Sequence, residues 1–180
     1  TDLSGTQELQ VRKSKDAYYG KSTAVEGTYK IDADLGQALA KGLDDFRNKK
    51  LFDFGFHDPN KIEMHSGTKA YFLERGRGEG ADWWSNAKKM DAESVQSYIS
   101  RVRDLTATNF VDFGFVNPTT EVTVTWDEGK QTEKVYFAKS GNNYIAKREN
   151  EPTLYLMDSG AIDTLQKAAD DIKPAAQPNK

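Results

Sequence analysis

Three stretches of the chain carry apolar side chains at the spacing of one helical face, and each begins after an aspartate. The faces are Leu35, Leu39, Leu43 and Phe46 after Asp32, then Val95, Tyr98, Ile99, Val102 and Leu105 after Asp91, then Ile162, Leu165, Ala169 and Ile172 after Asp158. An aspartate in this place can accept a hydrogen bond from a free backbone N–H of the first turn, so it is a good N-cap. The pattern predicts three amphipathic helices.

Between these stretches the apolar positions alternate with period two, which is typical of half-buried strands. Residues 121–126 and 132–138 flank a turn that contains Gly129, residues 61–64 and 69–74 flank Ser66-Gly67, and residues 144–148 and 153–157 flank Glu151-Pro152. Each pair predicts an antiparallel hairpin. The expected fold class is therefore α+β, with antiparallel hairpins in a sheet and three amphipathic helices packed on it.

The sequence also matches itself at two spacings. Asp53-Phe54-Gly55-Phe56 recurs 59 residues later as Asp112-Phe113-Gly114-Phe115. At a spacing of 126, Tyr18, Lys21, Tyr29 and Asp32 match Tyr144, Lys147, Tyr155 and Asp158. We interpret these matches as a repeated strand–helix unit, with copies at about 1–50, 51–109 and 110–173 in a single domain over residues 1–173. The four phenylalanines are expected in the core, and residues 174–180 are expected to form a flexible tail.

Composition narrows the class of protein. A chain of 180 residues with 9 Phe, 8 Tyr and 3 Trp has ample material for one folded core. Its 25 basic and 28 acidic residues are mixed along the chain, which argues against a nucleic-acid partner. Without cysteine it can form neither disulfides nor zinc–thiolate sites. No apolar stretch reaches membrane-spanning length. Because the chain begins at Thr1 and not at Met, we expect a processed or trimmed N-terminus, and such processing could have removed a signal or anchor segment.

Several segments resemble a bacterial family known as domain of unknown function 4340. They are Tyr29-Lys30-Ile31-Asp32, the run from Leu43 to Phe54, the Trp83-Trp84 segment, Tyr144-Ile145-Ala146-Lys147 and Leu154-Tyr155-Leu156-Met157-Asp158. The resemblance covers roughly residues 18–172. It implies an extracytoplasmic (periplasmic or envelope) domain, often behind one N-terminal membrane segment and in some members encoded beside transport or gliding-associated machinery. This chain lacks that anchor, and the resemblance carries no catalytic residue over to it.

Two local motifs resemble ligand sites but have simpler explanations. The run from Gly76 to Ala81 loosely fits the dinucleotide pattern G-x-G-x-x-A, which needs a helix after it. Asp82-Trp83-Trp84 follows instead, so a hairpin tip is the better interpretation. The run from Asp32 to Gly36 resembles the start of a calcium loop but lacks the third oxygen ligand, the central glycine and the closing glutamate. A helix N-cap accounts for these aspartates.

Four side chains remain as candidate site residues. His57 and His65 could serve as bases or nitrogen ligands, but each lies beside a turn and their spacing fits no known site. We expect both on the surface. Trp83 and Trp84 are adjacent on an expected strand, so one should be buried and the other exposed, with Tyr71 or Tyr98 near it. An exposed tryptophan could stack on a sugar ring or on a partner's side chain. Alternatively, both pack under the helix after Asp91.

The sequence thus predicts a non-catalytic extracytoplasmic interaction or scaffold domain, accessory to membrane transport or envelope assembly. Its expected partner is another protein, which could be part of a membrane complex. A segment that is absent from this chain would tether the full-length protein to the membrane. We expect no catalytic residue, no metal and no cofactor. One alternative is a small-ligand or glycan-binding module that uses Trp83 or Trp84. Another is a hydrolase-type enzyme that uses His57 or His65.

Overall fold

The computed structural model describes residues 5–78 and 80–176, and its contacts divide the chain into two compact units. Unit 1 is Thr1–Arg47 and unit 2 is Asn48–Lys180, whereas the sequence indicated one domain over residues 1–173. Within the described part of the chain, each unit has a sheet of its own, and the strand pairs in both are antiparallel. With helices in both units, the predicted α+β class is confirmed.

Unit 1 consists of a small sheet and a short helix. The sheet has the strand order β1 (Leu9–Ser14), β2 (Ala17–Ser22), β3 (Tyr29–Ile31), and α1 (Ala33–Leu39) follows it. Asp32 caps α1 as predicted, because its carboxylate accepts a hydrogen bond from the Asp34 N–H at 2.8 Å. Gly36 lies so close to the Tyr18 ring that a Cβ at this position would be 2.1 Å from it. This contact buries Tyr18 and requires glycine in the helix.

The helix of unit 1 is shorter than the sequence indicated. It ends at Leu39, and a separate 3₁₀ turn, η1 (Leu43–Asp45), begins after Gly42, whose N–H donates to the Asp45 carboxylate at 2.7 Å. The prediction of one buried helical face is wrong here, since Leu35, Leu39, Leu43 and Phe46 are 46%, 52%, 79% and 73% exposed. A unit of this size has too little apolar surface of its own to cover them.

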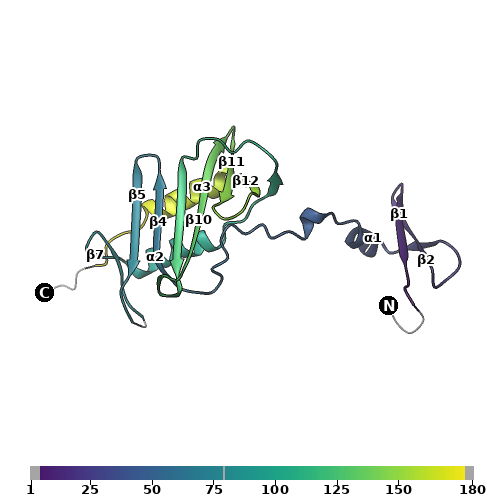
Figure 1. Ribbon diagram of the computed structural model, residues 1–180, viewed down its shortest axis with the longest axis horizontal. Coiled ribbons are helices and arrows are strands. Elements are labelled where there is room, and N and C mark those ends of the chain that lie inside the picture. The colour runs from purple at the N-terminus through teal and green to yellow at the C-terminus, as the bar shows by residue number, and fades with distance from the viewer. Residues whose placement is uncertain (1–4, 79, 177–180) are drawn as a thin grey trace. The chain divides into compact units, whose positions relative to one another are not determined.

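Unit 2 is built on a larger sheet. In the described residues it has nine strands in the order β7-β6-β5-β4-β9-β10-β11-β12-β8 (Figure 1). The strands are β4 (Pro59–Ser66), β5 (Lys69–Arg75), β6 (Trp83–Ser85), β7 (Lys88–Lys89), β8 (Asn109–Val111), β9 (Thr120–Trp126), β10 (Gln131–Ser140), β11 (Asn143–Arg148) and β12 (Leu154–Asp158), with a 3₁₀ turn η2 (Asp127–Gly129) after β9. The predicted hairpins are β4–β5, β9–β10 and β11–β12, and all are confirmed. The short strand β6 agrees with the strand expected at Trp83-Trp84, whereas β7 and β8 were not predicted.

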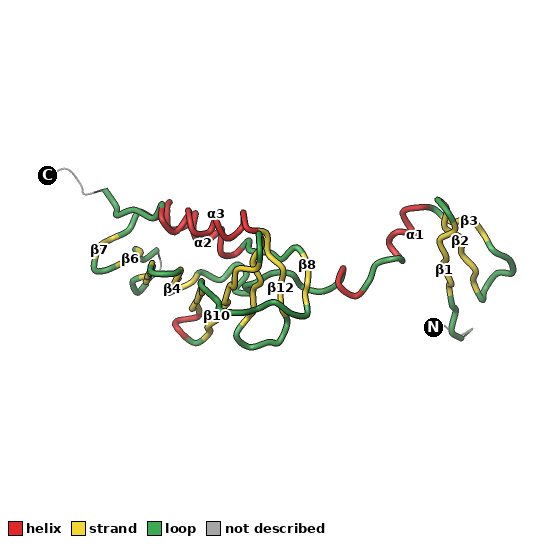
Figure 2. The backbone as a smooth tube through the Cα atoms, turned by 90° about the horizontal axis from the view of Figure 1, so that it is seen from above, coloured by secondary structure: helices red, strands yellow, loops and turns green. Residues whose placement is uncertain are grey.

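Two helices, α2 (Ala92–Arg103) and α3 (Ser159–Asp170), lie on one face of this sheet, as Figure 2 shows from above. Asp91 and Asp158 cap them as predicted, by accepting hydrogen bonds from Ser94 N–H at 2.9 Å and Gly160 N–H at 2.7 Å. The core lies between helices and sheet. From the helices it contains Val95, Tyr98, Ile99, Val102, Ile162, Leu165 and Ala169, and from the sheet Ile62, Met64, Val122, Val124, Val135, Phe137, Tyr155 and Met157. Both helical faces are therefore buried as the sequence indicated.

The two Asp-Phe-Gly-Phe segments differ in their surroundings. Phe54 is fully buried, but Phe56 is 99% and Phe113 is 83% exposed, so the prediction that all these rings pack in the core is wrong. Gly55 has a φ of 56°, and His57 N–H donates to the Phe54 carbonyl at 2.9 Å. The segment is therefore a tight turn, which points Phe56 outward, and not the extended chain that the alternation assumed. These segments do not confirm the repeated strand–helix unit.

A different correspondence does hold in the strand registers. Each pair of facing residues in the sheet of unit 1 has a counterpart 126 positions later in β10, β11 and β12. Examples are Leu9↔Ser22 with Val135↔Arg148 for the first hairpin, and Tyr18↔Ile31 with Tyr144↔Met157 for the second. The helices α1 and α3 begin 126 positions apart as well. We call β10, β11, β12 and α3 the reference block.

At its C-terminal end the chain stays paired beyond the last helix. Pro174 forms a bridge with Met90, and Ala175 N–H donates to the Lys89 carbonyl at 2.9 Å. The first residues of the predicted tail are therefore held against β7. Residues 177–180 of that tail lie outside the described residues.

Candidate functional site

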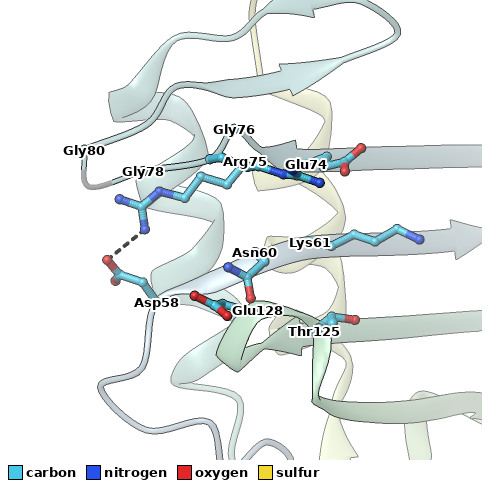
Figure 3. Close-up of a pocket in the computed structure, with 12 residues that line it drawn as sticks. Asp58, Asn60, Lys61, Glu74, Arg75, Gly76, Gly78, Gly80, Thr125 and Glu128 are labelled. Atoms are coloured by element: carbon cyan, nitrogen blue, oxygen red, sulfur yellow. Dashed lines mark hydrogen bonds and ion pairs between the residues drawn. The ribbon is translucent and has the colours of Figure 1, made fainter.

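A hollow of about 870 Å³ opens at one end of the larger sheet, where β4, β5 and β9 meet their turns. Its lining includes Asp58, Asn60, Lys61, Glu74, Arg75, Gly76, Gly78, Gly80, Thr125 and Glu128 (Figure 3). Arg75 reaches over the opening toward Asp58, and its guanidinium is 2.9 Å from the Asp58 carboxylate. Charges of both signs line the walls, so the hollow suits a small polar group better than a strongly charged one.

A β-bulge lies in the wall of this hollow. Pro59 faces Trp126 and Lys61 faces Thr125, which leaves Asn60 with no residue opposite. Its Oδ1 atom is buried, and among the described residues it has no hydrogen-bond partner. Bulges often re-aim a side chain beside a functional site, and a buried acceptor without a donor is unfavourable. Asn60 therefore places an unsatisfied, buried acceptor in the lining of this hollow. No sequence motif marks it.

The glycine run beside the hollow is a hairpin loop. Gly76 N–H donates to the Asp82 carbonyl at 2.9 Å, and the next element is β6, which pairs with β5. A dinucleotide site needs a helix N-terminus at this point to hold the pyrophosphate. The run has no such helix after it, so the hairpin interpretation is confirmed. Glu79 of this run lies outside the described residues.

The two histidines lie toward opposite ends of β4. His57 precedes that strand and lines a second hollow with Asp53, Asp58 and Asp127, while His65 lies near the end of the strand. Both side chains are exposed, and among the described residues neither imidazole hydrogen-bonds to a hydroxyl or a carboxylate. Within the same residues, no group of three or more His, Cys, Asp or Glu side chains is placed to hold a metal ion. The structure does not bring the histidines together.

Near His57, Arg148 is the centre of an ion-pair network. Its guanidinium lies 2.8 Å from the Asp53 carboxylate and 3.2 Å from that of Glu133, and Asp53 N–H donates to Glu133 at 2.9 Å. Burial raises the pKa of Glu133, although the Asp53 N–H and Arg148 oppose this shift. The network fastens the segment before Phe54 to β10 and β11. We interpret its role as structural, because the carboxylates of Asp53 and Glu133 both bind the Arg148 guanidinium and Glu133 also accepts the hydrogen bond from Asp53 N–H.

The tryptophans divide between the two faces of β6 as predicted. Trp83 is 8% exposed and belongs to the core, whereas Trp84 is 42% exposed on the opposite, open face. The prediction that Tyr71 or Tyr98 lies near the exposed tryptophan is wrong. Tyr98 is buried in the core, and the Tyr71 hydroxyl donates a hydrogen bond to Asp170 of α3. Phe72, 37% exposed, is on the open face instead. Lys61 Nζ is 4.8 Å from the centre of its ring.

Unit 1 exposes most of its large apolar side chains. Leu9, Tyr19, Val25, Tyr29, Leu35, Leu39, Leu43 and Phe46 are between 38% and 79% exposed. We call these residues the apolar set of unit 1. Each of these side chains forgoes its burial energy as long as it stays in water. The helical spacing of Leu35, Leu39 and Leu43 shows in the sequence, but their exposure does not.

Comparison with known families identifies the chain. A family model described as Domain of unknown function (DUF4340) matches residues 6–113, which run from unit 1 into unit 2. No curated protein and no solved structure matches the sequence. In the described part of the chain, none of the helices is long and apolar enough to cross a membrane.

Proposed function

Because the chain belongs to the family described as Domain of unknown function (DUF4340), we propose that it is a non-catalytic interaction or scaffold domain. In this proposal it acts outside the cytoplasm, at the cell envelope, as an accessory to a membrane transport or envelope assembly. The observation that carries the proposal is the exposure of the apolar set of unit 1. The envelope location is supported by the resemblance of the sequence to that family.

The energetics favour a protein partner for this surface. Burial of a leucine or phenylalanine side chain contributes about 1.5–3 kcal/mol. Leu39, Leu43 and Phe46 each keep more than half of their surface in water, at 52%, 79% and 73% exposure. A partner that covers them recovers this energy, and it also covers Leu35 on the same short helix. The two histidines, which are exposed and lie toward opposite ends of β4, give no comparable support to a hydrolytic function.

Site-specific photocrosslinking in living cells tests the proposal. A photoreactive amino acid at Leu39 should form covalent adducts with a protein, identified by mass spectrometry. The same amino acid at Lys167, an exposed position of α3, serves as the control. If Leu39 gives no more protein adducts than Lys167, the interaction function is contradicted.

The location has a separate test, because the chain contains no cysteine. A single Lys167→Cys substitution in the protein expressed in its native context should react with a membrane-impermeant maleimide in intact spheroplasts. Labelling only after lysis would contradict an extracytoplasmic location.

A second candidate function is small-ligand or glycan binding on the open face of the sheet. Trp84 and Phe72 are 42% and 37% exposed there. Glu74 faces Trp84 across the strand pair, so polar groups flank the aromatic surface. Aromatic faces beside hydrogen-bonding side chains are suited to stack on sugar rings.

A further inference from the structure

Unit 2 has two halves with the same order of elements. The first half is β4-β5-β6-β7-α2, and the second is β9 followed by the reference block, β10-β11-β12-α3. In the sheet, the strands of each half run outward, in opposite directions, from the central pair of β4 and β9. In this antiparallel pair Ile62 faces Val124 and Met64 faces Val122, so a residue of β4 has its counterpart 60 positions later in β9. The two halves can therefore be compared strand by strand.

The first half departs from the second at the hollow beside β4, β5 and β9. Residues 76–82 separate β5 from β6, whereas only Gly141 and Asn142 separate β10 from β11. Asn60 forms the bulge of β4 and has no residue opposite. Its counterpart Thr120 faces Ser66, is 5% exposed and has its hydroxyl 3.0 Å from the Ser66 hydroxyl. The first half is thus open at a place where the second half is closed.

The turn after β9, on another side of the same hollow, is strained. Asp127, Glu128 and Gly129 of η2 have φ angles of 50°, 54° and 89°, all in the left-handed region. This conformation is unfavourable for residues other than glycine, and such strain clusters at functional sites. In the corresponding turn between β4 and β5, which the structure describes in full, only Gly67 has a positive φ, of 58°. The connection of two strands therefore does not by itself require the strain in η2.

Most charges near the hollow are engaged within the protein or point away from it. The Arg75 guanidinium is 2.9 Å from the Asp58 carboxylate, and Lys61 Nζ is 2.9 Å from the Glu63 carboxylate. Figure 3 shows the charged ends of Lys61 and Glu74 on the far side from the Arg75–Asp58 pair. These groups leave little charge for a ligand.

Two charged side chains of the lining, Glu128 and Arg77, are not engaged. Among the described residues neither has a hydrogen-bond or ion-pair partner. A carboxylate accepts hydrogen bonds from an ammonium group, and a guanidinium donates a fork of hydrogen bonds to a carboxylate. The described lining residues include four glycines, whose peptide groups no side chain covers, and none is aromatic or a large aliphatic residue. The hollow thus offers polar contacts and no surface for ring stacking.

We propose that this hollow binds a small zwitterion, an amino acid or short peptide with free termini, whose ammonium group contacts Glu128 and whose carboxylate contacts Arg77. Phosphates and other polyanions are disfavoured, because the carboxylates of Asp58 and Glu128 belong to the same hollow. The volume of about 870 Å³ lies in the range of small-molecule pockets. The site belongs to unit 2 and is independent of the interaction function proposed for the apolar set of unit 1.

Titration of the isotope-labelled full chain, followed by two-dimensional NMR, tests the proposal. The probes are a panel of free amino acids together with triglycine. At least one probe should shift the amide signals of Asn60, Gly76 and Gly129 to saturation. The same probe with its amino group acetylated and its carboxylate amidated has lost both charges and should leave these signals in place. No saturable shift with any probe, or equal shifts with the capped form, would overturn the proposal.

Substitutions test the two charged contacts separately. Glu128→Gln and Arg77→Gln should each weaken binding at least about tenfold, because each removes a charge-assisted hydrogen bond. Glu93→Gln and Arg101→Gln make the same changes at exposed positions of α2 and are the matched controls. If all four variants bind like the unsubstituted chain, the two contacts are refuted.

Glu128→Gly adds a measurement that separates binding from folding. Glycine adopts a positive φ without strain, so this variant should be at least as stable as the unsubstituted chain in a thermal melt, yet it should lose binding with its carboxylate. Undiminished binding by Glu128→Gly would contradict the role assigned to this side chain.

Discussion

Leu39 of α1 and Leu165 of α3 occupy corresponding positions in two blocks whose strands pair in the same register, yet Leu39 is 52% exposed and Leu165 is 1% exposed. The residue type and the N-capping aspartate are the same in both places, but α1 ends at Leu39 whereas α3 continues to Asp170. The surroundings differ as well, because Leu165 lies in a block that β9 and α2 cover. The difference in exposure therefore goes with a longer helix and with coverage by distant elements.

The first prediction concerns this pair. Leu165→Ala should lower the free energy of unfolding by about 2–5 kcal/mol, because it leaves a cavity in the core of unit 2. Leu39→Ala should change it by less than about 1 kcal/mol when the chain is dilute and monomeric, since the side chain already contacts water. Urea denaturation followed by circular dichroism measures both. Equal losses in the two variants would contradict the difference in burial.

The two phenylalanines of the repeated tetrapeptide give a second matched pair. Phe54 is fully buried, near the rings of Phe52 and Trp126, so Phe54→Ala should cost about 3–5 kcal/mol. Phe113 is 83% exposed, so Phe113→Ala should leave the thermal midpoint nearly unchanged. A thermal melt followed by tryptophan fluorescence suits this test, because all three tryptophans belong to unit 2. A large loss for Phe113→Ala would show that its ring is packed.

The contact between Gly36 and Tyr18 predicts an unusual pair of effects. Gly36→Ala should loosen unit 1 although alanine favours helices, because its Cβ would lie 2.1 Å from the Tyr18 ring. Adding Tyr18→Ala should restore part of the lost protection, since it removes the ring that clashes. Hydrogen exchange of the β2 and α1 amides reports the result. If Gly36→Ala slows exchange instead, the close contact is contradicted.

A fourth prediction concerns acid stability. Lys69 Nζ lies 2.8 Å from the Asp170 carboxylate, which also accepts a hydrogen bond from the Tyr71 hydroxyl. The hydrogen bond from Lys69, followed by that from Tyr71, holds the pKa of Asp170 below its ordinary value. A carboxyl with a depressed folded-state pKa stabilises the fold above the unfolded-state pKa, about 3.9, and this contribution is lost as pH falls through the folded pKa.

Asp170→Asn should therefore lower the thermal midpoint at neutral pH, and the difference should shrink as the pH falls below about 3.9 and through the folded-state pKa of Asp170. Asp163→Asn, an exposed carboxylate on the same helix, is the control and should behave like the unsubstituted chain. Thermal melts at a series of pH values make the comparison. A stability difference that persists undiminished in acid would show that the ionised carboxylate is not its source.

The open face of the sheet gives a fifth prediction. Titration with a panel of neutral oligosaccharides should shift the tryptophan fluorescence if Trp84 binds sugar rings, and Trp84→Ala should abolish the shift. Trp126→Phe is the control, because Trp126 lies near Phe54, on another strand than Trp84. No shift with any oligosaccharide would remove the second candidate function.

The sequence alone determined the local structure of this protein. Three aspartates mark the helix starts because an N-cap needs only its own first turn, and Asp32, Asp91 and Asp158 all accept the expected bonds. The long hairpins follow from period two, which residues near one another in sequence specify. The opposite burial of Trp83 and Trp84 follows from the alternation of a strand.

Tertiary structure decided the remainder. The bulge at Asn60 and the hollow beside it depend on β4 pairing with β9, about 60 residues away, for which no local pattern exists. Burial is decided in the same way. The spacing of Leu39 and Leu165 identifies an apolar face in each helix, but only elements from elsewhere in the chain determine whether that face is covered. For this reason the sequence predicted both leucines buried, and the fold buries one of them.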